Sequence, residues 1–150
     1  MNFKDYLNST IKIANEEKDI LDQLHDKFQD AKIDALFIRA AERSLQILSE
    51  NMIGKFKKVL QYYNCQIIPN SGYDALQILH TVGIFDEIQE RKFRKILGFR
   101  NALVHDYMEF NRKIVITIVR DRDYMFLYEF LIEKSHYKEI FIRRIENFKF

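Results

Sequence analysis

The sequence predicts an all-α protein folded as a single domain over residues 1–150. Only one Pro and four Gly occur, whereas all-β sandwiches and barrels need many tight turns. Hydrophobic residues make up 47% and charged residues 31%, which is ordinary for a soluble domain that buries a core. Apolar residues also recur at three- and four-residue steps through most of the chain, as one face of an α-helix requires.

Two long helices are expected first. The first runs from about Phe3 to Phe28, and its opposite face is acidic, as is typical of a solvated surface. The second begins near Asp30 or Asp34 and reaches Met52, with small alanines that allow close helix packing. Two endings are compatible with the pattern: either Gly54 ends the second helix or the following K-F-K-K-V-L-Q segment extends it.

The pattern lapses over residues 62–72, where P-N-S-G is the strongest break signal in the chain. A short helix is predicted from about Tyr73 to Val82, ended by Gly83 as a C-terminal cap. Asp86 is then the expected N-cap of a helix that leads to Arg100.

The remaining elements are less regular in pattern. The run K-I-V-I-T-I-V is rich in β-branched residues, which favour strands. Because no second strand-like segment is available to pair with it, we predict a helix that continues to Leu131. The pattern allows a kink between Arg120 and Asp123. Residues 134–150 are basic and aromatic, and two interpretations apply: a last helix or a tail that docks a partner.

Several classes of protein are disfavoured by composition. The single Cys65 excludes an internal disulfide, and no Cys/His grouping has metal-ligand spacing. The sequence therefore predicts no metal site and no cofactor. The longest aliphatic run is far too short to cross a bilayer, and the first residues lack the pattern of a signal peptide. A soluble, cytoplasmic protein with no membrane contact is expected.

Charge is unevenly distributed along the chain. The net charge is only +2, and residues 1–35 hold eight acidic against five basic residues. Residues 91–105, in contrast, hold five basic residues and no acidic one. A local basic strip of this kind can recruit a polyanion that the net charge would not suggest. The candidate RNA-binding residues in it are Arg91, Lys92, Arg94 and Lys95.

The basic strip leads into G-F-R-N-A-L-V-H-D-Y, which concentrates five polar side chains within eight residues: Arg100, Asn101, His105, Asp106 and Tyr107. Histidine can act as general base or acid near neutrality, and the guanidinium fork suits two phosphate oxygens. RNA carries its own nucleophile, the 2′-hydroxyl. These residue types therefore fit cleavage of RNA without a metal ion.

Helix geometry limits how this cluster can work. Five residues separate Arg100 from His105, about 140° around a regular helix. Either the helix breaks within residues 101–106, or a second copy of the protein completes the site. One histidine cannot be acid and base in the same step, and a two-fold dimer would supply a second one.

A purely structural interpretation of the cluster also stands. Arg100 would cap the helix or pair with Asp106, His105 would hydrogen-bond the backbone, and Tyr107 would be a core aromatic residue. Such a helical bundle would lose only stability on mutation of these residues.

The string R-N-A-L-V-H-D-Y has the form R-x-x-x-x-H-x-Y. Preceded by G-F, it resembles the signature of HepT-type HEPN proteins, the toxin halves of HEPN/MNT toxin–antitoxin pairs. The resemblance extends upstream through P-N-S-G-Y-D-A-L-Q-I-L, G-I-F-D-E and D-A-L-F-I-R-A-A-E-R-S-L-Q-I-L, and covers roughly residues 30 to 132.

This resemblance implies an all-α, antiparallel HEPN bundle that forms a two-fold homodimer, with the motif lining a cleft at the axis. Arg100 and His105 match the family's ribonuclease residues, and Asn101 and Asp106 match its polar motif positions. The implied activity is metal-independent cleavage of transfer RNA or messenger RNA. The implied partner is an MNT-type nucleotidyltransferase antitoxin that transfers AMP from ATP to Tyr107 and thereby inhibits the toxin.

A rival function within the same family is a non-catalytic HEPN subunit. Such a subunit would bind a nucleotide with Arg100 and His105, or present a substrate to the nucleotidyltransferase.

Overall fold

The computed structural model describes residues 2–30, 32–105 and 108–150. The described residues form seven helices and no strand, which confirms the predicted all-α class. The helices are α1 (Phe3–Lys27), α2 (Ala35–Tyr62), α3 (Gly72–Thr81), α4 (Glu87–Val104), α5 (Met108–Arg120), α6 (Tyr124–Ile132) and α7 (Glu139–Glu146). None of the helices in these ranges is both long and apolar enough to span a membrane.

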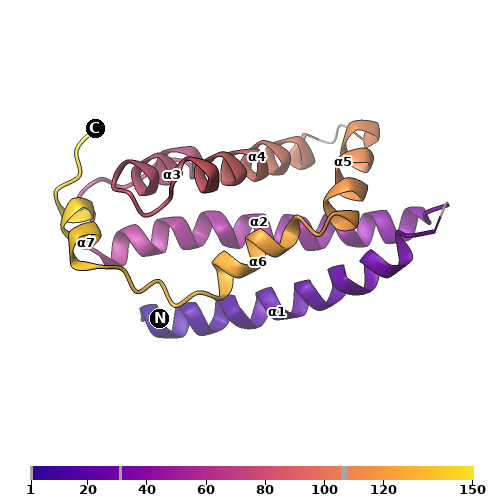
Figure 1. Cartoon of the computed structure of the whole chain (residues 1–150), viewed down its shortest axis with the longest axis horizontal. Helices are drawn as coiled ribbons and strands as arrows, with labels where there is room; N and C mark the ends of the chain where they lie inside the picture. Colours follow the sequence, from indigo (N-terminus) through magenta and orange to yellow (C-terminus); the bar gives the residue numbers. More distant parts are fainter. Residues whose placement is uncertain (1, 31, 106–107) are drawn as a thin grey trace.

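The helices α1 and α2 form an antiparallel pair along the long axis of the molecule (Figure 1). Side chains of Asn2 and Asp34 cap them by accepting hydrogen bonds from backbone N–H groups of their first turns. Gly54 lies inside α2, which continues to Tyr62. A Cβ atom at Gly54 would lie 3.1 Å from the Tyr6 hydroxyl. This glycine therefore permits a close approach of α1 rather than ending α2.

The helices α3 and α4 return along α2 in the opposite direction (Figure 1). The predicted short helix is confirmed to within one residue, and Gly83 follows it with a φ of +95°, a conformation that favours glycine. Asp86 and Gln89 form a reciprocal capping box at the start of α4. The predicted N-cap is therefore confirmed.

The β-branched run is helical, as predicted, and forms most of α5. The kink allowed between Arg120 and Asp123 is a full break, however, so the segment forms two helices and not one. α5 ends at Arg120, Arg122 adopts a φ of 55°, and α6 begins at Tyr124. A residue with positive φ cannot continue a right-handed helix. The break lets α5 cross the end of the bundle while α6 runs along α1 (Figure 1).

The carboxyl-terminal segment folds back on its own chain. It contains α7, in which Ile145 is fully buried. Arg144 donates a hydrogen bond from Nη1 to the Val82 carbonyl oxygen at 3.2 Å. The end of α3 and the helix α7 are thereby joined at one end of the bundle.

An aromatic cluster fills the core between α2, α4 and α6. The Phe56 ring lies 5.2 to 5.7 Å, centroid to centroid, from the rings of Phe85, Phe93 and Phe130. Offset and edge-on aromatic contacts of this kind add to the stability gained from burying the ring area. The abundance of phenylalanine in the sequence is explained in part by this cluster.

A fully buried lysine borders the aromatic cluster. Lys55 Nζ donates hydrogen bonds to the carbonyl oxygens of Phe130 and Glu133, the latter at 2.8 Å, and lies 4.6 Å from the centroid of the Phe130 ring. Burial lowers the pKa of Lys55 to about 8, against the opposing effect of the Glu133 carboxylate. Lys55 therefore ties α2 to the last turn of α6.

Candidate active site

Arg100 lies in the last turns of α4 and reaches across to α2. Its Nε donates to Glu50 Oε1 at 2.9 Å, and its Nη2 donates to Glu50 Oε2 at 3.3 Å. The remaining Nη1 donates to Asn101 Oδ1 at 3.2 Å. The guanidinium is thus held by a bidentate ion pair, the geometry in which arginine binds a carboxylate or a phosphate most specifically.

This ion pair is open to solvent. The side chain of Arg100 is 31% exposed and that of Glu50 is 45% exposed, so water and ligands can compete for both charges. Ion pairs at such exposure contribute about 0–1 kcal/mol to stability. A phosphate oxygen could therefore replace the Glu50 carboxylate at modest cost. Neither structural alternative considered above for Arg100 includes Glu50.

His105 is the C-cap residue of α4, because the helix ends at Val104. Its backbone N–H still donates to the Asn101 carbonyl oxygen at 3.2 Å, and its φ and ψ are −89° and 1°. The helical rotation is thus kept up to His105, about 140° around the axis from Arg100. His105 is exposed. The helix does end within residues 101–106, but too late to bring the two side chains onto one face.

A buried asparagine supports the end of α4. Asn111, which is 3% exposed, donates from Nδ2 to the Ala102 carbonyl oxygen at 3.3 Å. Its Oδ1 accepts no hydrogen bond in the described part of the chain. The contact fixes α5 against the turn that carries Asn101 and His105. Asp106 and Tyr107, also expected in this site, lie outside the described residues.

The basic strip is exposed but its members differ in their surroundings. Arg94 is paired with Glu90, at 2.5 Å between Nη2 and Oε1. Lys92 and Lys95 line a hollow of about 580 Å³ between α4, α5 and α6, whose walls include Phe99 and Phe126. Lys92 Nζ lies 5.0 Å from the centroid of the Phe126 ring.

Asp123 shares the hollow with these lysines. Burial and the nearby Asp121 carboxylate raise the pKa of Asp123, although Lys92 and Lys95 act in the opposite direction.

Within residues 2–30, 32–105 and 108–150, no three His, Cys, Asp or Glu side chains gather closely enough to hold a metal ion.

Residues 10–133 match the protein family described as "Ribonuclease HepT-like". This chain belongs to the HepT-like ribonuclease family. The match begins at Thr10 within α1 and extends just past the end of α6, so it includes the elements that carry Arg100, His105 and Glu50. A search of curated proteins found no match.

Two solved structures share the HepT-like fold of this chain. The first is the tri-AMPylated HEPN toxin of Shewanella oneidensis in complex with its MNT antitoxin, with a TM-score of 0.73 and 23% identity over 88% of this chain and 96% of that chain. The second is a toxin–antitoxin structure with AMP-PNP, with a TM-score of 0.67 and 23% identity over 89% of this chain and 100% of that chain. At this identity the likeness establishes the HEPN-type bundle.

In this HepT-like chain the structure brings Arg100 together with a carboxylate, Glu50, that sequence patterns did not reveal, whereas His105 lies on another face of the helix end. Glu50 lies 50 residues before Arg100, on a helix face with ordinary polar composition. No local spacing signals such a partner. It becomes visible only once α2 and α4 are packed together.

Proposed function

We propose that this HepT-like protein is a metal-independent endoribonuclease toxin in which Arg100 and His105 are the catalytic residues. The observation that carries the proposal is the family match over residues 10–133, which contains the intact R-x-x-x-x-H-x-Y sequence; its Arg100 lies in the last turns of α4 and its His105 is the C-cap of that helix. Arg100 has a side chain that solvent reaches, and His105 is exposed. Both are therefore accessible to a polyanionic substrate.

The proposed reaction uses the nucleophile that RNA supplies. The 2′-hydroxyl oxygen attacks the adjacent phosphorus, a new O–P bond forms, and the bond from phosphorus to the 5′-oxygen of the next nucleotide breaks. Histidine takes the hydroxyl proton or donates one to the leaving oxygen. The Arg100 guanidinium stabilises the negative charge that develops on the phosphate oxygens. The products are a cyclic 2′,3′-phosphate and a 5′-hydroxyl end.

A two-fold homodimer would complete the site. In one chain, α4 directs Arg100 and His105 about 140° apart, and one imidazole cannot serve as base and acid at once. Two copies facing one cleft would bring an Arg100 and a His105 from each copy to the same RNA. Two-fold dimers are the commonest assembly of identical chains.

The proposed regulation is covalent. A partner nucleotidyltransferase antitoxin of the MNT type would transfer AMP from ATP to the Tyr107 hydroxyl and release pyrophosphate. The support comes from the S. oneidensis HEPN toxin of the same fold, which is described as tri-AMPylated and in complex with an MNT antitoxin. An AMP group two residues from His105 would place a negative charge beside Arg100 and fill the space meant for RNA.

The substrate class proposed is transfer RNA or messenger RNA in the cytoplasm. Of the basic strip, Arg91, Lys92 and Lys95 form no ion pair within the described ranges, whereas Arg94 is held by Glu90. We therefore expect the first three to contribute more to RNA binding than Arg94, because Arg94 must break its ion pair with Glu90 before it can pair with a phosphate. Asn101 would orient the guanidinium through its Oδ1 contact, and Asp106 is assigned the second polar position.

The test is RNA cleavage by the purified protein in EDTA, followed on a denaturing gel. We expect cleavage by the wild type, and loss of about a hundredfold or more in Arg100→Ala and in His105→Ala. Arg143→Ala, which removes an exposed arginine from α7, is the matched control and should keep full activity. Intact mass after co-production with the partner should show adenylyl increments that Tyr107→Phe abolishes.

Two results would contradict the proposal. Cleavage that survives both substitutions would show that Arg100 and His105 are not the catalytic residues. A wild type that does not cleave RNA would show that the protein is not a ribonuclease. An inactive wild type that binds AMP at Arg100 and His105 would instead favour the non-catalytic nucleotide-binding subunit. A wild type whose substitutions change only stability would favour a purely structural bundle.

A further inference from the structure

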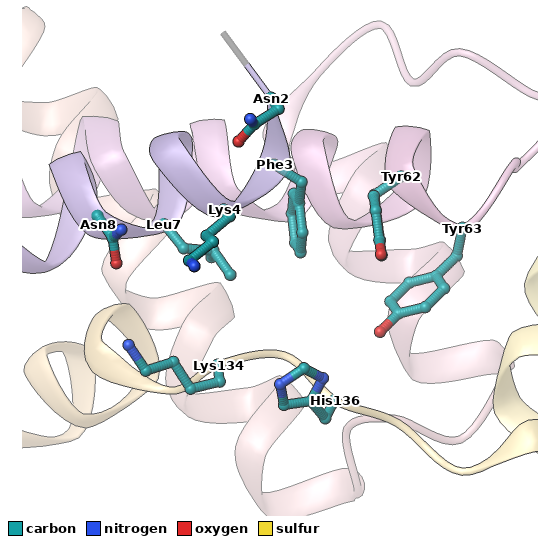
Figure 2. A pocket seen from close by; sticks show the side chains of 9 residues that line it. All are labelled: Asn2, Phe3, Lys4, Leu7, Asn8, Tyr62, Tyr63, Lys134 and His136. Carbon is teal, nitrogen blue, oxygen red and sulfur yellow. The ribbon is translucent and has the colours of Figure 1, made fainter.

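A second cavity lies away from the candidate active site. It has a volume of about 530 Å³ and is bounded by the start of α1, the end of α2 and the segment between α6 and α7. We name it the amino-end pocket, and its lining residues are Asn2, Phe3, Lys4, Leu7, Asn8, Tyr62, Tyr63, Lys134 and His136 (Figure 2). Figure 1 shows that this end of the bundle is opposite to the junction of α4 and α5.

One wall of the amino-end pocket is aromatic. The rings of Phe3 and Tyr62 are stacked, with centroids 4.1 Å apart and planes 10° from parallel. Tyr63 continues the wall, its ring 4.9 Å from that of Tyr62 and steeply inclined to it. Tyr62 remains 53% exposed although it is one of the larger apolar side chains. Because Tyr62 is exposed and lines the pocket, a planar ring in the pocket can contact this aromatic wall.

The opposite wall is held in place by a hydrogen bond. The Tyr63 hydroxyl donates to the Ser135 carbonyl oxygen at 2.6 Å, which fixes the chain that carries Lys134 and His136. Figure 2 shows the His136 ring across the pocket from Phe3 and Tyr62, and the Lys134 side chain extending from the same segment toward the side of Asn8 and Lys4. The pocket is therefore built by two separate parts of the chain in a defined arrangement.

The lining is positively charged. It contains Lys4, Lys134 and His136 but no carboxylate. Across the described ranges neither lysine has an acidic side chain within ion-pair distance. The first turn of α1 adds the partial positive charge of a helix amino terminus, although Asp5 in the same turn offsets part of it. A ligand that joins a planar ring to a negatively charged group would therefore complement both the aromatic wall and the positively charged side chains of the pocket.

From these features we propose that the amino-end pocket binds a nucleotide unit, with its base against the aromatic wall at Phe3 and Tyr62 and its phosphate between Lys4 and Lys134. Two sources supply this chemistry: a free nucleoside monophosphate, and a nucleotide within single-stranded RNA. The RNA source rests on the proposed function and would make the pocket a second contact for the substrate, remote from the cut. Stacking accepts any base, so the contact would confer affinity rather than sequence preference.

The experiment measures binding without cleavage. The wild type is titrated against a fluorescent 2′-O-methyl oligonucleotide, which lacks the nucleophilic hydroxyl, and separately against AMP by calorimetry. We expect Tyr62→Ala to weaken oligonucleotide binding about five- to tenfold. Lys134→Gln should reduce the dependence of log Kd on log salt by about 0.7. The matched controls are Tyr73→Ala, a similarly exposed tyrosine on α3, and Lys138→Gln, which lies outside the pocket.

Each outcome decides a point. If the pocket variants bind both AMP and the oligonucleotide more weakly than the wild type, the pocket is a general nucleotide site. If they bind only the oligonucleotide more weakly, the pocket is an RNA contact. Unchanged binding of both ligands in Tyr62→Ala and Lys134→Gln overturns the proposal, as does inorganic polyphosphate competing equally well against the wild type and Tyr62→Ala. Because the oligonucleotide cannot be cleaved, these results do not depend on whether the protein is a ribonuclease.

Discussion

The buried Lys55 makes the stability of this protein depend on pH in an unusual direction. Its ammonium is enclosed between α2 and the last turn of α6, where burial lowers its pKa from 10.5 to about 8. Between these two values the unfolded chain holds a proton that the folded chain releases. The free energy of unfolding therefore rises with pH in this window and is lowest below about pH 8.

The size of the effect follows from the two pKa values. From pH 7 to pH 9 the free energy of unfolding should rise by about 1.3 kcal/mol, because each unit of pKa difference corresponds to about 1.4 kcal/mol. Tyr124 and Tyr137 have pKa values raised by burial, so they lower stability only above about pH 10. Measurements are therefore best confined to the range below that pH.

The assay is urea unfolding of the wild type, Lys55→Met and Lys57→Met at pH 7, 8 and 9. Lys55→Met should lose the pH dependence, although it also leaves the carbonyls of Phe130 and Glu133 without their donor. Lys57 is a neighbour on α2 that is not buried, so the Lys57→Met variant should keep the pH dependence of the wild type. An equal slope in wild type and Lys55→Met, or a flat wild-type profile, would refute the assignment.

Three further predictions concern single contacts. Gly83→Ala should destabilise the protein by about 1 kcal/mol or more in thermal unfolding, because φ is +95° and the new Cβ would lie 3.1 Å from Arg144 and Phe141 atoms. The control Gly98→Ala should be neutral or stabilising, because that glycine is helical and its new Cβ would make only an ordinary contact, at 3.9 Å, with the Tyr73 hydroxyl. Asp86→Ala should cost about 1 kcal/mol through loss of the capping box, and Asp86→Asn should recover most of it; an uncapped variant as stable as the wild type would contradict this. Glu50→Gln should change stability by less than about 1 kcal/mol yet tighten binding of the uncleavable oligonucleotide, since Arg100 loses its competing anion; weaker binding would show that Glu50 instead positions the guanidinium.

Much of the helical framework can be predicted because its signals are local. Asp86 caps α4 since a carboxylate at that position can accept from the first turn, and P-N-S-G breaks the chain since these residues leave helical backbone geometry readily. The β-branched run is helical because it has no strand partner. In each instance the cause lies within a few residues of the effect.

The features that the sequence did not predict depend on which helices pack against each other. Gly54 has the appearance of a helix end, but the approach of Tyr6 from α1 explains it. Glu50 and the amino-end pocket are likewise formed by segments distant in sequence. The kink allowed between Arg120 and Asp123 is a full helix break in which Arg122 has a positive φ, a backbone conformation that the residue type does not signal.

The Arg100–Glu50 ion pair affects how tightly Arg100 can bind a phosphate group. Binding there is an exchange of one anion for another, so the measured affinity reports only how much better the guanidinium holds phosphate than it holds Glu50. A singly charged phosphodiester competes with a singly charged carboxylate on nearly equal terms. In the proposed ribonuclease, occupancy of Arg100 by a phosphodiester would then depend on contacts elsewhere along the RNA.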